Sequence, residues 1–248
     1  MRLSAVFLVL LVMAGCTTQP IGEPSHGQTS ARLRTELAAE YYARAQLGVA
    51  LDELRKALLA DAGYAPAYDV RALVHMALRE DKEAEDDFMT SLRLDNMSSE
   101  THNNYGWFLC QRGRERDSVK QFLAALKNPL YTSPETAFLN AGVCSRKAGE
   151  DKDAEEFLKK ALLVHPGMTE ALSELADLYF AKADYANAKS TFKNLDHAAG
   201  ENLTAGNLWL GVRIERKLGN RNAQESYAMQ LHNRFPDSRE YQLMLNEQ

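Results

Sequence analysis

The chain has 248 residues and a formal net charge of −5, and its length suffices for one domain or two. The negative charge argues against a nucleic-acid partner, because such binding needs a basic surface that displaces counterions. The basic cluster Arg112, Arg114 and Arg116 is the local exception. We interpret it as a solvated turn and not as a phosphate site.

An apolar run from Leu3 to Gly15 follows Arg2 at the amino terminus. The run is too short for a transmembrane helix, which needs about 20 residues, but it is typical of an export signal. Ala14-Gly15 before Cys16 resembles a bacterial lipobox, which implies removal of residues 1–15 and lipidation of Cys16. Thr17, where an aspartate would cause inner-membrane retention, implies the periplasmic face of the outer membrane. The alternative is an ordinary secretory signal with a chance cysteine.

Residues 17–30 are rich in Thr, Ser, Gly and Pro and contain one large apolar residue, Ile21. Such a stretch cannot bury enough surface to order itself, so we expect residues 16–30 to form a flexible, lipidated tether. Without residues 1–15 the chain has 28 basic and 34 acidic residues, and 28 − 34 gives a charge of −6. Residues 31–248 are expected to form the folded domain.

The folded part carries a repeat of about 34 residues. A small residue recurs at Ala38, Ala72, Gly106, Gly142, Ala176 and Gly211. A second small residue follows 12 positions later, and it is alanine in five of the six copies. A large apolar residue follows 16 positions after the first, such as Phe122 in the third copy. This pattern matches the tetratricopeptide repeat, a helix–turn–helix unit in which small residues allow close packing. It predicts an all-α fold, a right-handed superhelix of six such repeats, with a non-repetitive helical bundle as the alternative.

Turn signals support this interpretation, since Gly113, Gly149, Asp184 and Gly219 fall between the two helices of their units. The first repeat departs most from the pattern, because no clear turn exists where Gly48 sits. The segment KNPLYTSPE, residues 127–135, lengthens one loop between repeats by two residues. We expect the superhelix to continue through it as one domain.

No catalytic or metal-binding motif is visible in the sequence. The histidines are scattered, and no pair has a metal-ligand spacing. They are His26, His75, His102, His165, His197 and His232. Acidic residues lie on helix faces beside basic ones, as Glu155 does beside Lys159. We therefore expect no enzyme activity, no cofactor and no small-molecule substrate; a hydrolytic enzyme on the same helices is an alternative that no residue favours.

Two cysteines remain if Cys16 carries lipid. Cys110 and Cys144 fall on the first helices of neighbouring repeats, which run side by side in such a stack. Disulfides persist outside the cytoplasm, so this pair is a disulfide candidate. Two buried free thiols are the alternative.

The first helices of such repeats line the concave face of the superhelix, where these proteins bind other proteins. The positions that face inward give an apolar amino-terminal half. They include the candidate groove residues Tyr42, Leu73, Met76, Asn103 and Trp107, and also Thr35, Ala39, Asp69, Leu139, Val143 and Arg146. Tyr, Trp and Met are enriched in protein interfaces. Leu73 and Trp107 could instead fill core between repeats, so Tyr42 and Met76 are the better candidates for exposed anchors.

The segment NNYGWFL at 103–109, the NPLY at 128–131 and the last repeat resemble the PilW or PilF family of type IV pilus biogenesis lipoproteins. This resemblance implies a pilotin: a non-enzymatic outer-membrane lipoprotein that binds a subunit of the pilus secretin and promotes its localisation, multimerisation or stability. The alternative is a repeat scaffold for another envelope assembly machine, such as outer-membrane protein assembly or peptidoglycan synthesis.

Overall fold

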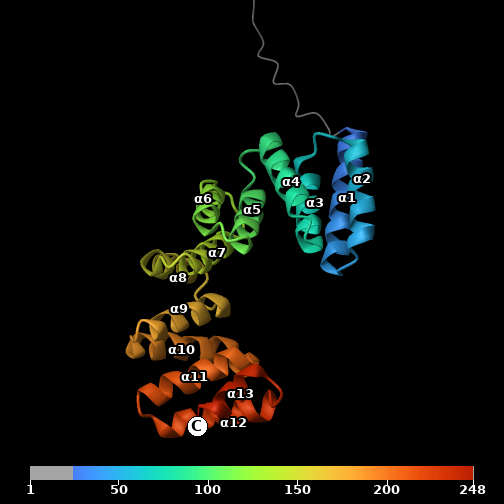
Figure 1. Ribbon diagram of the computed structural model, residues 1–248. Helices are drawn as coiled ribbons and strands as arrows, with labels where there is room; N and C mark the ends of the chain where they lie inside the picture. The colour runs from blue at the N-terminus through green and yellow to red at the C-terminus, as the bar shows by residue number, and fades with distance from the viewer. Residues whose placement is uncertain (1–24, 248) are drawn as a thin grey trace, which may run out of the picture.

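The computed structural model describes residues 25–247, and within that range every regular element is helical (Figure 1). The elements are α1 (His26–Ala43), α2 (Leu47–Ala60), α3 (Ala65–Leu78), α4 (Asp81–Leu94), α5 (Ser99–Gln111), α6 (Glu115–Ala125), α7 (Pro134–Lys147), α8 (Asp151–Val164), α9 (Thr169–Ala181), α10 (Tyr185–Ala199), η1 (Gly200–Asn202), α11 (Ala205–Lys217), α12 (Arg221–Arg234) and α13 (Arg239–Asn246). The predicted all-α fold class is confirmed.

Helices α1 to α12 form six successive hairpins, one for each predicted repeat. The turn inside each hairpin contains one residue in the left-handed region of φ. These residues are Ala45, Arg79, Gly113, Gly149, Ala183 and Gly219. The first turn is therefore at Ala45, and Gly48, where the sequence offered no clear turn, lies inside α2.

The small and large residues of the repeat pattern meet inside each hairpin. A Cβ atom added to Gly106 would lie 2.7 Å from Cε1 of Phe122, and one added to Gly142 would lie 2.7 Å from Cγ of Leu158. Both large side chains are fully buried. In these two hairpins the helices approach so closely that only a glycine fits opposite the bulky residue.

The hairpins stack in chain order and the stack turns as it grows (Figure 1). The pairs α1–α2 and α3–α4 stand upright at the upper right, whereas α7 to α10 lie across the molecule. The first helices, α1, α3, α5, α7, α9 and α11, contact one another in succession. Helix α13, which the sequence analysis missed, packs on α11 and α12 and buries Met244 at the end of the stack.

The predicted tether does not extend to residue 30. Helix α1 begins at His26 because Ser25 and Gln28 form a capping box, in which each side chain bonds to the other's backbone N–H. The predicted signal at residues 1–15 and the predicted lipidation at Cys16 lie outside the described residues. None of the helices within residues 25–247 is both long and apolar enough to cross a bilayer.

The predicted long loop is present between α6 and α7. It spans residues 126–133, whereas the loop from α4 to α5 spans only 95–98. Pro134 forms the first turn of α7, where its missing N–H is tolerated. The extra residues leave α6 and α7 in contact, so the hairpins on either side remain stacked.

Candidate protein-binding groove

The first helices of the first three repeats build a pocket that combines large apolar side chains with polar ones. Its volume is about 420 Å³. It is lined by Tyr42 from α1, by Met76 and Ala77 from α3, by Trp107 and Gln111 from α5, and by Arg79 and Arg112, which directly follow α3 and α5. Tyr42, Met76 and Trp107 are each half-buried, so their apolar surface is open to a ligand. We call this site the aromatic pocket. Three of the five predicted groove residues therefore meet in one place.

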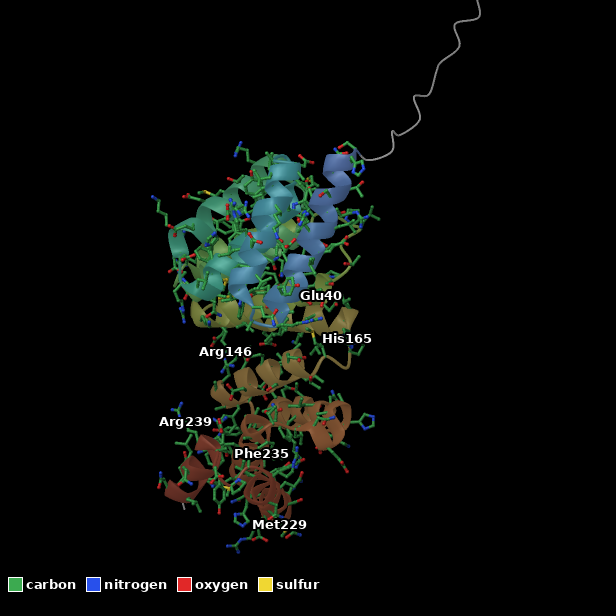
Figure 2. All side chains as sticks on the ribbon, turned by 90° about the vertical axis from the view of Figure 1, so that its right-hand side faces the viewer. Glu40, Arg146, His165, Met229, Phe235 and Arg239 are labelled. Carbon is green, nitrogen blue, oxygen red and sulfur yellow. A yellow bond between two sulfur atoms is a disulfide. The ribbon has the colours of Figure 1, made fainter. Side chains whose placement is uncertain are left out.

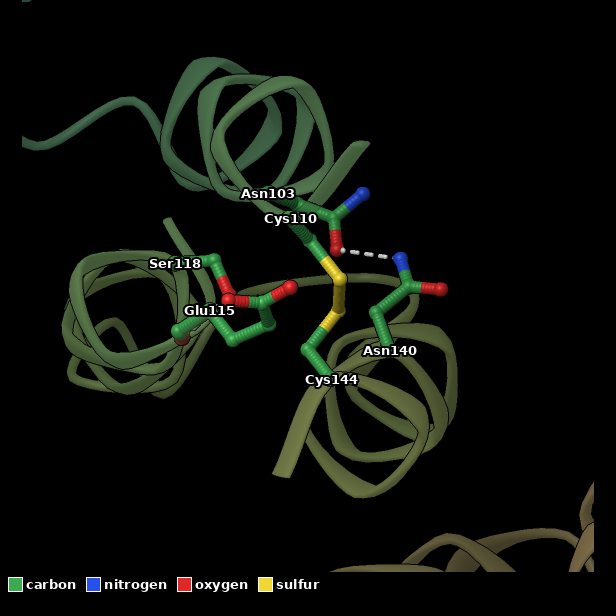
Figure 3. The surroundings of a disulfide bond; sticks show 6 residues. All are labelled: Asn103, Cys110, Glu115, Ser118, Asn140 and Cys144. Carbon is green, nitrogen blue, oxygen red and sulfur yellow. Dashed lines mark hydrogen bonds between the residues drawn. A yellow bond between two sulfur atoms is a disulfide. The ribbon is translucent and has the colours of Figure 1, made fainter. Parts of the chain in front are cut away.

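The other two predicted groove residues have different surroundings. Leu73 is half-buried against the core formed by Ala72, Phe88 and neighbouring residues, and it does not line the aromatic pocket. Asn103 accepts a hydrogen bond of 3.1 Å from Nδ2 of Asn140 (Figure 3). This bond ties α5 to α7 and occupies one of the groups that Asn103 could offer to a partner.

Three cationic side chains surround the aromatic pocket. Arg79 and Arg112 line it, and Nζ of Lys147 lies 5.7 Å from the centroid of the Trp107 ring. Arg112 donates to Oδ1 of Asp81 at 2.6 Å, while its buried Nε has no hydrogen-bond partner. No carboxylate lines the pocket. The basic cluster seen in the sequence is otherwise paired, since Arg114 donates to a carboxylate of α4 and Arg116 to one at the start of α8.

A buried acid lies between α3 and α5. Asp69 is only 8% exposed, and its Oδ2 accepts a 3.0 Å hydrogen bond from Asn104. Its Oδ1 is buried without any partner. Burial in low-dielectric surroundings raises the pKa of Asp69 to about 7, because the charged form loses its hydration. The repeat pattern placed Asp69 at an inward position but gave no sign that the carboxylate would be enclosed.

A disulfide joins the third and fourth repeats. The sulfur atoms of Cys110 in α5 and Cys144 in α7 are 2.07 Å apart, and both residues are buried (Figure 3). Trp107 packs against the cluster that contains both cysteines. The covalent link therefore holds the helix that carries Trp107 against its neighbour.

The concave face changes character beyond α5. On α7 the guanidinium of Arg146 donates to Glu174 at 3.3 Å and to Asp177 at 2.6 Å, both on α9 (Figure 2 labels Arg146). Arg213 of α11 donates to the other oxygen of Asp177 at 3.1 Å and lies 4.8 Å from the centroid of the Phe180 ring. We call these four charged residues the ion-pair network. Its members pair with one another without a ligand, although the buried Nε of Arg213 has no hydrogen-bond partner.

A second apolar surface, which the sequence analysis missed, lies on α1. A pocket of about 410 Å³ is lined by His26, Leu33, Arg34, Leu37 and their neighbours. Leu33 is 53% exposed and Leu37 is 43% exposed. An apolar pair four residues apart on α1 could have indicated this surface, because within residues 25–247 no helix precedes α1 in the stack to cover it.

Metal chemistry has no visible basis in the described part of the chain. No group of three or more His, Cys, Asp or Glu side chains within residues 25–247 is placed to hold a metal ion. His75 and His102 instead bond to Glu80 and Gln121 respectively. What the concave face offers is a pocket that combines Tyr, Met and Trp side chains with arginines, which are residue types enriched in protein interfaces.

No model of a known protein family matches the chain, but individual proteins match it over nearly its full length. The type IV pilus assembly protein PilF of Pseudomonas aeruginosa is 29% identical over 245 residues, which are 97% of this chain and 96% of that protein. The solved structure of P. aeruginosa PilF has a TM-score of 0.81 at 27% identity, covering 90% of this chain and 100% of the other.

The crystal structure of PilW, a widely conserved type IV pilus biogenesis factor, has a TM-score of 0.80 at 36% identity. The match covers 87% of this chain and 98% of PilW. The tetratricopeptide-repeat protein YrrB has a TM-score of 0.60 at 17% identity, covering 79% of this chain and 98% of that one, which supports the fold alone. These similarities confirm the predicted tetratricopeptide superhelix and the predicted family.

Proposed function

The chain belongs to the family of tetratricopeptide-repeat type IV pilus biogenesis factors that includes PilW and PilF, and we propose that it binds a subunit of the type IV pilus secretin. In this proposal the chain is a pilotin. It promotes localisation, multimerisation or stability of the secretin by holding a segment of the subunit, and it carries out no chemical step.

The aromatic pocket is the observation that supports binding of a protein segment. Tyr, Trp and Met side chains with apolar surface open to solvent are the residue types from which interface anchors are drawn. They come from three successive repeats, so a partner that fills the pocket contacts α1, α3 and α5 together. A ligand held this way is recognised by the stack and not by any single helix.

We also propose that Cys16 carries lipid and that the chain lies on the periplasmic face of the outer membrane. The support is the lipobox-like sequence before Cys16 and the threonine that follows it. Acyl chains contribute about 0.8 kcal/mol for each buried methylene, which is enough for a stable anchor when several chains are present. Tethering the groove at the bilayer would raise the effective concentration of a secretin subunit about to assemble there.

Capture of purified secretin subunit by the immobilised chain tests the proposed binding. We expect Tyr42→Ala and Met76→Ala each to weaken capture about tenfold or more, as expected for anchor residues. Met229→Ala is the matched control, because Met229 is 64% exposed on α12. Unchanged capture by both groove variants would remove the aromatic pocket from the proposal. If the double variant Leu33→Ala/Leu37→Ala lost capture while both groove variants kept it, the partner would instead bind the outer face of α1.

The anchor and the biological role need separate tests. A Cys16→Ser protein should no longer fractionate with the outer membrane, and retention there would contradict the proposed lipidation. A deletion strain should lose secretin multimers and twitching motility. General envelope defects with intact secretin would favour a scaffold for another envelope machine.

A further inference from the structure

We infer that the aromatic pocket takes a large apolar side chain, preferably aromatic, from an extended segment of the partner that carries carboxylates on either side of it. This inference rests on the proposed function, because it names the kind of segment that the same groove would hold. The evidence lies in the charges around the pocket, in the backbone of Arg79 and in the spacing of the three helices.

The rim of the pocket is cationic and not neutralised. Arg79 and Lys147 have no ion pair within residues 25–247, while Arg112 shares Asp81. Glu80, next to Arg79, is bonded to His75, and Lys147 lines a neighbouring pocket together with Glu115 and Asp117. Of the three rim cations, only Arg112 is held in an ion pair within residues 25–247. Carboxylates of a partner would find donors here, whereas lysines of a partner would meet like charges.

The backbone of Arg79 supports a role beyond folding. Arg79 has φ of 65°, in the left-handed region that favours glycine. The equivalent turn residue is glycine in the third, fourth and sixth repeats, at Gly113, Gly149 and Gly219, and alanine in the first and fifth. An arginine here is disfavoured by its Cβ atom and caps α3 at the edge of the pocket. Glycine would suit the turn better, so the fold alone does not account for the arginine.

The length of the occupant follows from the helix spacing. Packed helices lie about 8 to 10 Å apart, so α1 and α5 are separated by roughly 20 Å across α3. An extended chain advances about 3.3 Å for each residue. About six residues therefore cross the site, with one side chain in the pocket and the flanking carboxylates close to the cations Arg79, Arg112 and Lys147 around it.

Fluorescence anisotropy with labelled ten-residue peptides tests the inference on the full chain. The probe has one central tryptophan with two aspartates on each side, and the comparison peptides replace either the aspartates by lysine or the tryptophan by serine. We expect each replacement to weaken binding at least tenfold, and binding of the aspartate peptide to weaken as salt is raised. Equal affinity for the aspartate and lysine peptides would overturn the inference.

Arg79→Gly separates binding from folding. We expect this variant to weaken binding of the aspartate peptide about two- to fivefold, the range for one rim charge, while its thermal midpoint stays the same or rises. Ala183→Gly changes the equivalent turn in the fifth repeat, where φ is 59°, and should leave peptide affinity unchanged. Lys147→Gln should weaken binding to a similar extent. Full affinity in both Arg79→Gly and Lys147→Gln would contradict the assigned role of the rim.

The same proteins distinguish this inference from the proposed function. Capture of the secretin subunit without any preference for the aspartate peptide would leave the function standing and remove the inference. A clear preference for the aspartate peptide without capture of secretin would support the inference and remove the secretin as partner.

Discussion

The two halves of the concave face occupy the same position in the fold and differ in chemistry. In the amino-terminal half, α1, α3 and α5 present Tyr42, Met76 and Trp107 around the aromatic pocket. In the other half, α7, α9 and α11 are joined by the ion-pair network around Asp177. One half leaves apolar side chains partly uncovered, and the other pairs most of its charged groups with one another.

This difference shows how one repeat scaffold separates binding from structure. The small and large residues that close each hairpin are similar along the chain, so stacking does not require the two halves to differ. The inward positions are available for other purposes. Paired charges there give up little free energy to a ligand, whereas exposed aromatic side chains gain by burial. The binding half can therefore be recognised by the aromatic side chains that the stack leaves partly uncovered.

The largest expected effect concerns the joint between the halves. Replacing Cys110 and Cys144 together by alanine should lower the free energy of unfolding by about 3 to 4 kcal/mol, because the bridge spans 34 residues and restricts the unfolded chain. Urea unfolding measures this loss. A reducing agent should destabilise the original chain similarly and leave the double variant unaffected. A loss below about 1 kcal/mol would show that packing alone holds the halves together.

The next effect concerns the buried acid in the amino-terminal half. The pKa of Asp69 is about 7 in the folded chain, above the usual value of about 3.9 when unfolded. The unfolded chain thus releases this proton first, and stability falls as pH rises from about 4 to 7. Asp69→Asn should remove this dependence, adding about 2 kcal/mol at pH 8 and almost nothing at pH 4. Denaturant unfolding of both proteins at pH 8 and pH 4 measures this gain. An equal gain at the two pH values would contradict the raised pKa of Asp69.

A smaller effect is expected in the ion-pair network. Asp177→Ala leaves Arg146 with Glu174 alone and removes the carboxylate partner of Arg213, so the free energy of unfolding should fall by about 1 kcal/mol. The exposed Asp86, which has no ion pair within residues 25–247, provides the control variant Asp86→Ala. Peptide or secretin binding in the other half should not change. A loss of binding would show that the halves are coupled.

The smallest effect reverses the pH dependence seen with Asp69. Hydrogen bonds from Lys159 and Lys182 lower the pKa of Glu155 to about 2. These two hydrogen bonds stabilise the folded chain at every pH above the usual pKa of a glutamate. The stabilisation is lost as the pH falls from about 4.5 to 2. Since the side chains are partly exposed, Glu155→Gln should cost only about 0.5 kcal/mol at pH 7. Thermal unfolding should show a smaller stability difference between the original chain and Glu155→Gln at pH 3 than at pH 7. The same difference at both pH values would contradict the lowered pKa of Glu155.

The sequence was sufficient to predict the hairpins because their cause is local and repeated. Each glycine or alanine that faces a bulky residue recurs at a fixed spacing, as Gly106 does with Phe122. The same register placed Tyr42, Met76 and Trp107 on adjoining helices, and the structure brings these three together. The 34-residue periodicity therefore predicts both the fold and which residues lie in the groove.

Features that depend on single residues escaped the pattern. Arg79 is not a turn-forming residue type, and only its distance of 34 residues from Ala45 and from Gly113 marks its left-handed conformation. Helix α13 is too short to show a repeat, although Ser238 caps it in the usual way. The enclosure of Asp69 depends on how α5 packs against α3, which no local pattern reports.

The early start of α1 limits how far the folded body can stand from an anchor. If Cys16 is attached to the bilayer as proposed, nine residues lead from it to Ser25, and a chain of that length reaches at most about 30 Å. A tether that ended at residue 30 would reach roughly 50 Å. If that anchor is present, the capping box of Ser25 and Gln28 shortens the connection to the bilayer and keeps the folded repeats within a thin layer beside it.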